Sequence, residues 1–356
     1  MINKNNLKLL ILGISILIFT TGCAPQSVKI QALKPATVAE MADKKKVAVV
    51  KFENDKVGLS AKVEAQLAKK IIDKKRYFTV VNRSALNKII SEQKLQHSEL
   101  LDASNATTIG KLAGAEVIIT GTVTSDSERG SYYEDKVKCL SYYKKGGGCA
   151  RYHRYQVHCK TASATVSGTI NIIDVQKGTL IHAEDISKEY SGDTCKDGDK
   201  RYGLLKSDRD STKILSKSQA VSRLTNDIAY EFASKLSPKY VNFKVNLIEE
   251  LKIENLTQKQ KSTFKNSLKY IANGRNKKAE RMLERLHLSF NEASYELAYN
   301  LAVTKEANGK LKDALRLYIL ADELSPEPNK NIDFGIQRVE ENIISAIEAR
   351  KQLAAK

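Results

Sequence analysis

An alternating segment at residues 161–174 constrains the fold of this 356-residue chain more than any other feature. From 164 to 172 every even position is apolar or glycine and every odd position is polar. This period of two predicts a strand with one buried face. VQKG at 175–178 predicts a turn, and 179–190 then return as the antiparallel partner. The hairpin must bury its apolar face against another layer, so a sheet with packed helices is expected.

The sequence on either side of this hairpin supplies that layer. Runs rich in β-branched residues, including VAVVKF at 47–52, predict further strands. Segments with apolar residues every three or four positions predict amphipathic helices. We therefore predict an α/β domain over 46–237, a mixed sheet with packed helices. The expected strands are 47–52, 77–82 and 116–124, and the expected helices are 60–75, 84–94, 103–112 and 211–236.

The C-terminal third differs in character. A composition shift at 238–258 predicts a linker, and 259–356 read as an all-α domain. Two segments there are self-similar at a constant offset of 35, which resembles tetratricopeptide repeats. A generic pair of helical hairpins is the alternative, and the helix after Asn331 is expected to cap the pair. Ser267, Tyr270, Gly274, Ala279, Leu283 and Leu286 recur as Ala302, Lys305, Gly309, Ala314, Tyr318 and Ala321.

The N-terminus carries a targeting signal. Two lysines precede an apolar run at 9–19 and then small residues, the order of a secretory signal peptide. Simple secretion with cleavage after Ala24 would leave Pro25 first, which is unfavourable. The alternative is a bacterial lipobox, which TTGC resembles at Gly22 and Cys23 but not at Thr20, where leucine is usual. We predict a lipoprotein signal peptide at 1–22, lipidation of Cys23 and a tether at 23–45. Ala24 resembles outer-membrane sorting.

Charge and cysteine content fit an envelope protein. The formal net charge is +18, which a solvated lysine-rich surface explains and which would also attract anionic lipid or envelope polymer. Nucleic acid is a poor partner for a secreted chain. Without Cys23 an even set of cysteines is left for an oxidising compartment. These are Cys139, Cys149, Cys159 and Cys195.

Three blocks resemble the curli-secretion lipoprotein family, CsgG. They are VAVVKFEN at 47–54, RYFTVVNRSALNKIISEQKLQHSELLDASNATTIGKLAGAEVIITGTV at 76–123, and ATVSGTINIIDVQKGTLIHAEDISKEYSG at 164–192. The resemblance implies a CsgG-like α/β domain in an outer-membrane lipoprotein of an oligomeric secretion system. The penicillin-binding-protein activator lipoproteins (LpoB) share the fold with weaker likeness.

Channel-forming members of that family insert two hairpins into the outer membrane, which would lie here at about 125–162 and 187–210. A spanning strand needs one apolar face. Within 132–143 the even positions include Glu134, Lys136 and Lys138, and the odd positions include Asp135. Each charge facing lipid would cost about 2–4 kcal/mol near the midplane. We therefore expect that this chain is not itself a pore.

The cysteines fall in those two hairpin regions. A turn at 175–178 pairs Asp174 with Thr179, and the same register places Cys159 opposite Thr194, one residue from Cys195. We predict Cys159–Cys195 and, by difference, Cys139–Cys149, although three connectivities are possible and a bulge would change the register. The hairpins would then be stapled protrusions.

A contact patch is the best functional candidate in the first protrusion, where tyrosines lie among lysines and arginines. A self-packed loop would look the same in sequence. The candidate residues are Tyr132, Tyr133, Tyr142, Tyr143, Tyr152 and Tyr155.

Motifs for catalysis or cofactor binding do not emerge. Cys149, His153, His158 and Cys159 invite a zinc site, but their spacing fits no common finger and disulfides are favoured. GGG at 146–148 lacks the ending of a phosphate loop, and neither G-x-S-x-G nor H-E-x-x-H occurs. We expect no enzyme activity, cofactor or metal.

These features predict an outer-membrane lipoprotein facing the periplasm that binds and scaffolds in envelope assembly or secretion. Its expected partners are membrane lipid through Cys23 and envelope or secretion proteins through the hairpins and repeats, and a homo-oligomer is compatible. The alternatives are an activator of peptidoglycan synthases and an oligomeric secretion channel.

Overall fold

A computed structural model describes residues 26–93, 99, 102–143, 147–196 and 214–355. The chain divides into two compact units. The α/β unit comprises residues 35–239 and the C-terminal residues from 349, and the helical unit comprises the chain up to residue 34 and residues 240–348. The predicted signal peptide and Cys23 lie outside the described residues.

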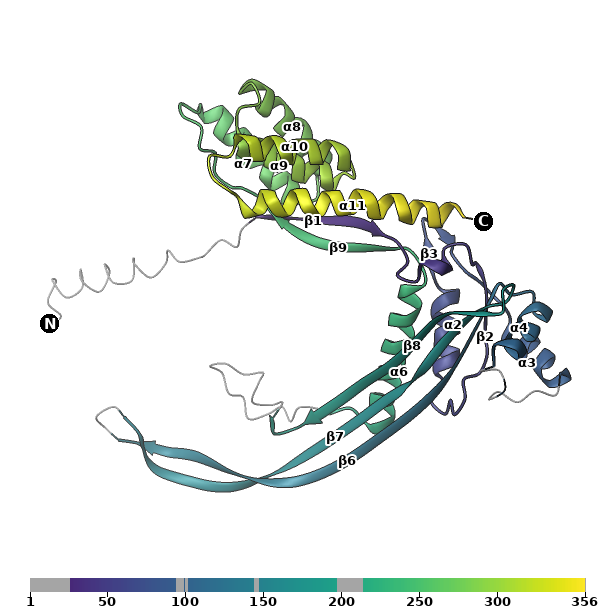
Figure 1. Cartoon of the computed structure of the whole chain (residues 1–356). Coiled ribbons are helices and arrows are strands. Elements are labelled where there is room, and N and C mark those ends of the chain that lie inside the picture. Colours follow the sequence, from purple (N-terminus) through teal and green to yellow (C-terminus); the bar gives the residue numbers. More distant parts are fainter. Residues whose placement is uncertain (1–25, 94–98, 100–101, 144–146, 197–213, 356) are drawn as a thin grey trace. The chain divides into compact units, whose positions relative to one another are not determined.

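The α/β unit is built on a five-stranded sheet in the order β5-β2-β6-β7-β8 (Figure 1). β2 runs parallel to β5 and β6, whereas β6, β7 and β8 are antiparallel neighbours. The predicted mixed sheet is therefore confirmed. Its strands are β2 (Lys46–Val49), β5 (Thr79–Val80), β6 (Val117–Tyr142), β7 (Cys149–Asp174) and β8 (Thr179–Asp193).

Helices cover both faces of this sheet. Ile119 and Ile172 point into a core shared with α2 (Leu59–Ala68) and α6 (Lys217–Lys235). Their neighbours Ile118 and Ile173 point the other way, into a core shared with α3 (Arg83–Glu92) and α4 (Ala103–Leu112). All four isoleucines are at most 1% exposed. A fully buried side chain of this size contributes about 1.5–3 kcal/mol, so this part of the sheet anchors the unit.

The helix predicted at 60–75 ends early. α2 stops at Ala68, and β3 (Ile71–Ile72) pairs with β4 (Lys75–Arg76). The two residues between them, Asp73 and Lys74, both have positive φ angles, which suits a tight hairpin turn. Ile71 fits the apolar helical spacing only by coincidence, because its side chain is 63% exposed.

The helical unit contains two antiparallel helical hairpins. Gly274 and Gly309 end the first helix of each, with φ angles of 73° and 76° in the left-handed region that favours glycine. They are thirty-five residues apart, as the repeat predicts. The helices are α7 (Gln258–Ala272), α8 (Asn276–Ser289), α9 (Tyr295–Ala307), α10 (Leu311–Leu324) and α11 (Lys330–Ala354), whose last residues belong to the α/β unit. The all-α region is confirmed, and its assignment to tetratricopeptide repeats stays a prediction.

Two segments predicted as tether and linker are strands instead. β1 (Ser27–Lys34) lies in the predicted tether at 23–45, and β9 (Lys239–Asn246) lies in the predicted linker at 238–258. They form a two-stranded sheet. Val28, Ile30 and Val245 enter the core of the helical unit. Burial of their alternate residues, which neither strand achieves alone, is the reason that both segments are ordered.

A buried ion pair links α9 to α11. The guanidinium of Arg338 donates to both carboxylate oxygens of Glu306, at 2.9 and 2.8 Å. The Tyr318 hydroxyl from α10 also donates to Glu306, at 2.9 Å. The Glu306 side chain is fully buried. Burial and this carboxylate raise the pKa of Tyr318 well above its ordinary value.

Candidate functional site

The most exposed part of the α/β unit is a long two-stranded ribbon. β2 pairs with β6 only at residues 117–119, and the ladder between β7 and β8 ends where Thr161 meets Asp193. Beyond these points, 132–142 of β6 and 149–159 of β7 pair with each other (Figure 1). Among the described residues no further strand pairs with this ribbon. Most of its side chains are exposed, on both faces, so the ribbon offers two surfaces to partners.

Two disulfides staple the ribbon at its two ends, with the pairing that the sequence predicts. Cys139 is joined to Cys149, and Cys159 to Cys195. The register differs from the prediction by one residue. Between β7 and β8 the pairing shifts after Ile173, because Ile181 is an extra residue on β8. This bulge moves Cys195 directly opposite Cys159, where their Cα atoms are 5.5 Å apart.

The six candidate tyrosines do not form one surface. Residues that face each other across an antiparallel pair share a face. Tyr132 lies opposite Cys159 and Lys136 opposite Tyr155 on one face, whereas Tyr133 and Tyr152 lie on the other. Tyr133, Tyr142, Tyr143 and Tyr152 are 69, 73, 64 and 61% exposed, and Tyr155 is 38% exposed.

Tyr132 has a different environment from the other five. Its hydroxyl donates a 2.9 Å hydrogen bond to Asp193, at the end of β8. This hydrogen bond raises the pKa of Tyr132 above its ordinary value. Tyr132 therefore ties the base of the ribbon to β8 beside the Cys159–Cys195 disulfide, and the other five tyrosines carry the exposed surface.

The ribbon is also cationic from residue 136 onward. From residue 136 to 173 the sequence contains no acidic residue. Lys136 and Tyr155 lie on one face, and Arg154 and Tyr152 on the other. Tyrosines beside cations offer hydrogen bonds, apolar area and charge together, a combination that is enriched at protein interfaces.

The two cysteines of the alternative zinc site both form disulfides in the structure. Cys149 and Cys159 are each bonded to another cysteine, so neither offers a thiolate. Ligand atoms of Glu134, Cys159 and Cys195 lie within 4.8 Å of one another. The sulfur atoms of that group are joined to each other, which leaves Glu134 as its remaining ligand.

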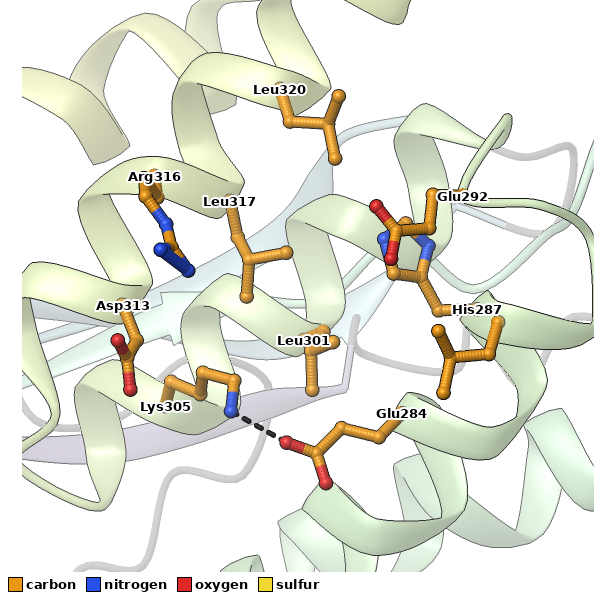
Figure 2. Close-up of a pocket in the computed structure, with 10 residues that line it drawn as sticks. Glu284, His287, Glu292, Leu301, Lys305, Asp313, Arg316, Leu317 and Leu320 are labelled. Carbon is orange, nitrogen blue, oxygen red and sulfur yellow. Dashed lines mark hydrogen bonds and ion pairs between the residues drawn. The ribbon is translucent and has the colours of Figure 1, made fainter.

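A second candidate site, which the sequence analysis did not single out, lies in the helical unit. A cavity of about 510 Å³ opens between α8, α9 and α10 (Figure 2). His287 lines it, is 3% exposed, and has no hydrogen-bond partner for either ring nitrogen among the described residues. Its place one turn after Leu283 on the apolar face of α8 was the available sequence signal. The lining residues are Glu284, His287, Leu288, Glu292, Leu301, Lys305, Asp313, Arg316, Leu317 and Leu320.

The stability of the helical unit is expected to fall as the pH drops below about 6.5 because of His287. Burial lowers the pKa of the folded imidazole below its ordinary value of 6.5. Between these two values the unfolded chain binds a proton that the folded chain does not, so acid favours unfolding. Urea midpoints at pH 7.5 and 5.5 would measure this. His287→Gln should have the smaller loss at pH 5.5, and equal losses would contradict the prediction.

In the described part of the chain no helix is both long and apolar enough to cross a bilayer.

A search of the curated proteins finds no match. The sequence matches the family described as curli production assembly/transport component CsgG over residues 29–265. This range includes the whole sheet and the ribbon and covers about two thirds of the chain, so the chain belongs to the CsgG family.

Proposed function

We propose that this chain is a lipoprotein of the outer membrane, anchored through Cys23 and facing the periplasm, that binds and scaffolds other proteins during envelope assembly or secretion. Membership of the CsgG family supports the setting, because that family is described by curli assembly and transport. The proposed role is binding without catalysis. Its partners would be envelope or secretion proteins and further copies of the chain.

The observation that carries the proposal is the stapled ribbon. It presents four exposed tyrosines among cations on two strands whose ends are fixed by disulfides, and Tyr143 directly after β6 is a fifth. Holding such side chains on a cross-linked scaffold lowers the entropy lost on binding. Tyrosine and arginine are the residue types that most often dominate the energetics of interfaces. The ribbon therefore suits a protein partner.

A secretion channel is the second candidate, and the charge of the ribbon argues against it. Lys136 and Glu134 lie on one face, and Asp135 and Arg154 on the other. Either face would bring charges toward lipid, at about 2–4 kcal/mol each near the midplane. Ion conductance by the purified protein in planar bilayers would favour the channel. An activator of peptidoglycan synthases, the third candidate, would be favoured by capture of such synthases.

Replacing Tyr142 and Tyr152 by serine is expected to reduce partner capture at least about tenfold, because interface tyrosines often contribute more than 1 kcal/mol each. Both side chains are mainly exposed, so stability should change by less than about 0.5 kcal/mol. Crosslinking in intact envelopes followed by affinity purification would measure the capture. Tyr230→Ser, an equally exposed tyrosine of α6, is the matched control. Unchanged capture by the double variant would contradict the proposal that the ribbon binds the partner.

Replacing Cys23 by serine is expected to move the chain from the membrane fraction to the soluble fraction. Several acyl chains on one residue bind a bilayer stably, and the serine variant has no thiol to acylate. Fractionation of envelopes and mass spectrometry of the mature N-terminus would measure this. Membrane association that is the same in both proteins would count against lipidation, independently of any result on the ribbon.

A further inference from the structure

One side of α9 is already filled by the chain itself. Asn300 accepts from the Ile248 N–H at 3.0 Å and donates to the Ile248 carbonyl at 2.7 Å. Glu296 accepts from the Lys252 N–H at 2.9 Å. These buried side chains of α9 hold the backbone that follows β9 as a groove holds an extended peptide. A ligand of the helical unit would therefore have to bind elsewhere.

The cavity between α8, α9 and α10 is the alternative. Figure 2 shows Leu301 and Leu317 at its centre and Leu320 beside them. Leu288 is 61% exposed, which places the mouth at the surface. About 510 Å³ is the size of a ligand pocket, and its lining combines four leucines with five charged side chains and His287.

His287 determines what the cavity can recognise. Leaving a buried polar atom without a partner costs free energy, and neither of its ring nitrogens has a partner among the residues that the structure describes. Burial also favours the neutral imidazole, which has one N–H donor and one acceptor nitrogen. A hydroxyl group can donate to the acceptor nitrogen or accept from the N–H, one at a time, and is itself neutral.

We propose that this cavity binds a tyrosine side chain presented by a protein partner. The ring would lie against Leu301, Leu317 and Leu320, and the phenol hydroxyl would reach His287 when the exposed Glu292 side chain beside it moves aside. The site lies in the helical unit and does not involve the ribbon, so it goes beyond the proposed function.

Charge disfavours other ligands. A carboxylate would be repelled by Glu292 and Asp313 and would need a protonated imidazole. An ammonium group would pair with the exposed carboxylates of Glu292 and Asp313, which would leave the buried imidazole without a partner. Lys305 and Glu284 at the lower wall already satisfy each other at 2.6 Å. A neutral amphipathic ring has none of these penalties.

The apolar surface beyond the cavity points to a protein rather than a free phenol. Leu288 at the mouth and Ile319, next to Arg316 on the surface of α10, are 61 and 41% exposed. A free phenol would leave both in water, whereas the residues that flank a tyrosine could cover them.

The test follows the imidazole signals of the full chain, labelled with ¹³C at histidine, during NMR titrations. The probes are N-acetyl-tyrosinamide, N-acetyl-phenylalaninamide and p-cresol. We expect N-acetyl-tyrosinamide to shift the His287 signal saturably. N-acetyl-phenylalaninamide should bind at least about tenfold more weakly, because a ligand without the hydroxyl leaves the imidazole unpaired. The His182 signal of the α/β unit should not move. His287→Gln assigns the signal, and Leu320→Trp, which fills the cavity, should abolish binding with thermal unfolding unchanged.

Two results would overturn the proposal. Equal affinity for the tyrosine and phenylalanine probes, or no shift at His287, would show that the imidazole does not recognise a hydroxyl. Binding of p-cresol with exclusion of N-acetyl-tyrosinamide would show that the cavity admits free phenols and not a residue within a protein. Neither result depends on lipidation or on the ribbon.

Discussion

Replacing Arg338 by alanine is expected to destabilise the helical unit by about 3–5 kcal/mol. The substitution leaves the Glu306 carboxylate fully buried, with the Tyr318 hydroxyl as its remaining hydrogen-bond donor among the described residues. The guanidinium also lies over the rings of Phe243 and Tyr318, at 5.6 and 5.8 Å from the ring centres, and that packing is lost as well. Urea unfolding followed by circular dichroism, with hydrogen exchange of the α9 amides, would measure the loss.

Two further variants distinguish the cost of leaving a buried carboxylate unpaired from the cost of losing an ion pair at the surface. Lys188 pairs with Glu231 on the surface, where both side chains are more than a third exposed. Lys188→Ala should therefore change stability by less than about 1 kcal/mol. The double variant Glu306→Leu, Arg338→Met should recover much of the stability lost in Arg338→Ala, because an apolar pair needs no charge compensation. A loss below about 1 kcal/mol in Arg338→Ala would contradict the assignment.

Replacing Cys159 and Cys195 by alanine is expected to destabilise the α/β unit by about 4 kcal/mol. The disulfide closes a loop with a sequence separation of 36, and the entropy lost by the unfolded chain on closure grows with loop length. Cys159 is fully buried and Cys195 is 6% exposed, so this bond ties β7 to the chain beyond β8 where both are packed. Urea unfolding of the oxidised protein would measure the effect, with mass spectrometry to verify the remaining disulfide.

The other disulfide provides a matched control. Cys139–Cys149 has a sequence separation of 10 and lies at the exposed end of the ribbon. Residues there can open locally without unfolding the sheet, so Cys139→Ala, Cys149→Ala should change global stability by less than about 1 kcal/mol. Hydrogen exchange should instead increase in the ribbon. Equal global losses in both variants would mean that the ribbon unfolds together with the sheet.

The central hairpin could be predicted because its information is local. Alternation over 161–174 and the turn at 175–178 are contained within thirty residues and lead directly to β7 and β8. The disulfide pairing followed from the same register. The bulge at Ile181 could not be predicted, because Leu180 and Ile181 are both apolar and an extra residue beside a similar one leaves no distinct pattern.

β1 and β9 were missed for the opposite reason. Val28 and Ile30 alternate with polar residues, but the segment is short and lies between Pro25 and Pro35. Its strand partner is more than two hundred residues away, in β9. Local sequence patterns do not indicate a strand pairing over that separation.

The buried polar residues of the helical unit were also beyond sequence reasoning. Glu306 and Asn300 stand at positions of α9 that a hydrophobic pattern would assign to solvent, and both are at most 1% exposed. Their burial is tolerated because Arg338 and the Ile248 backbone satisfy them. His287 is buried with no such partner in the described part of the chain, and that environment can be recognised only in three dimensions.

If Cys23 is lipidated as proposed, the position of β1 limits the distance between the folded chain and the membrane. The strand begins at Ser27, four residues after Cys23. An extended chain spans at most about 3.6 Å per residue, so an acylated Cys23 would keep the start of β1 within roughly 14 Å of the lipid surface. The predicted tether at 23–45, if it were fully extended, would allow a distance several times larger. The helical unit would then stay close to the bilayer. Its partners would therefore have to bind near the membrane and not deep in the periplasm.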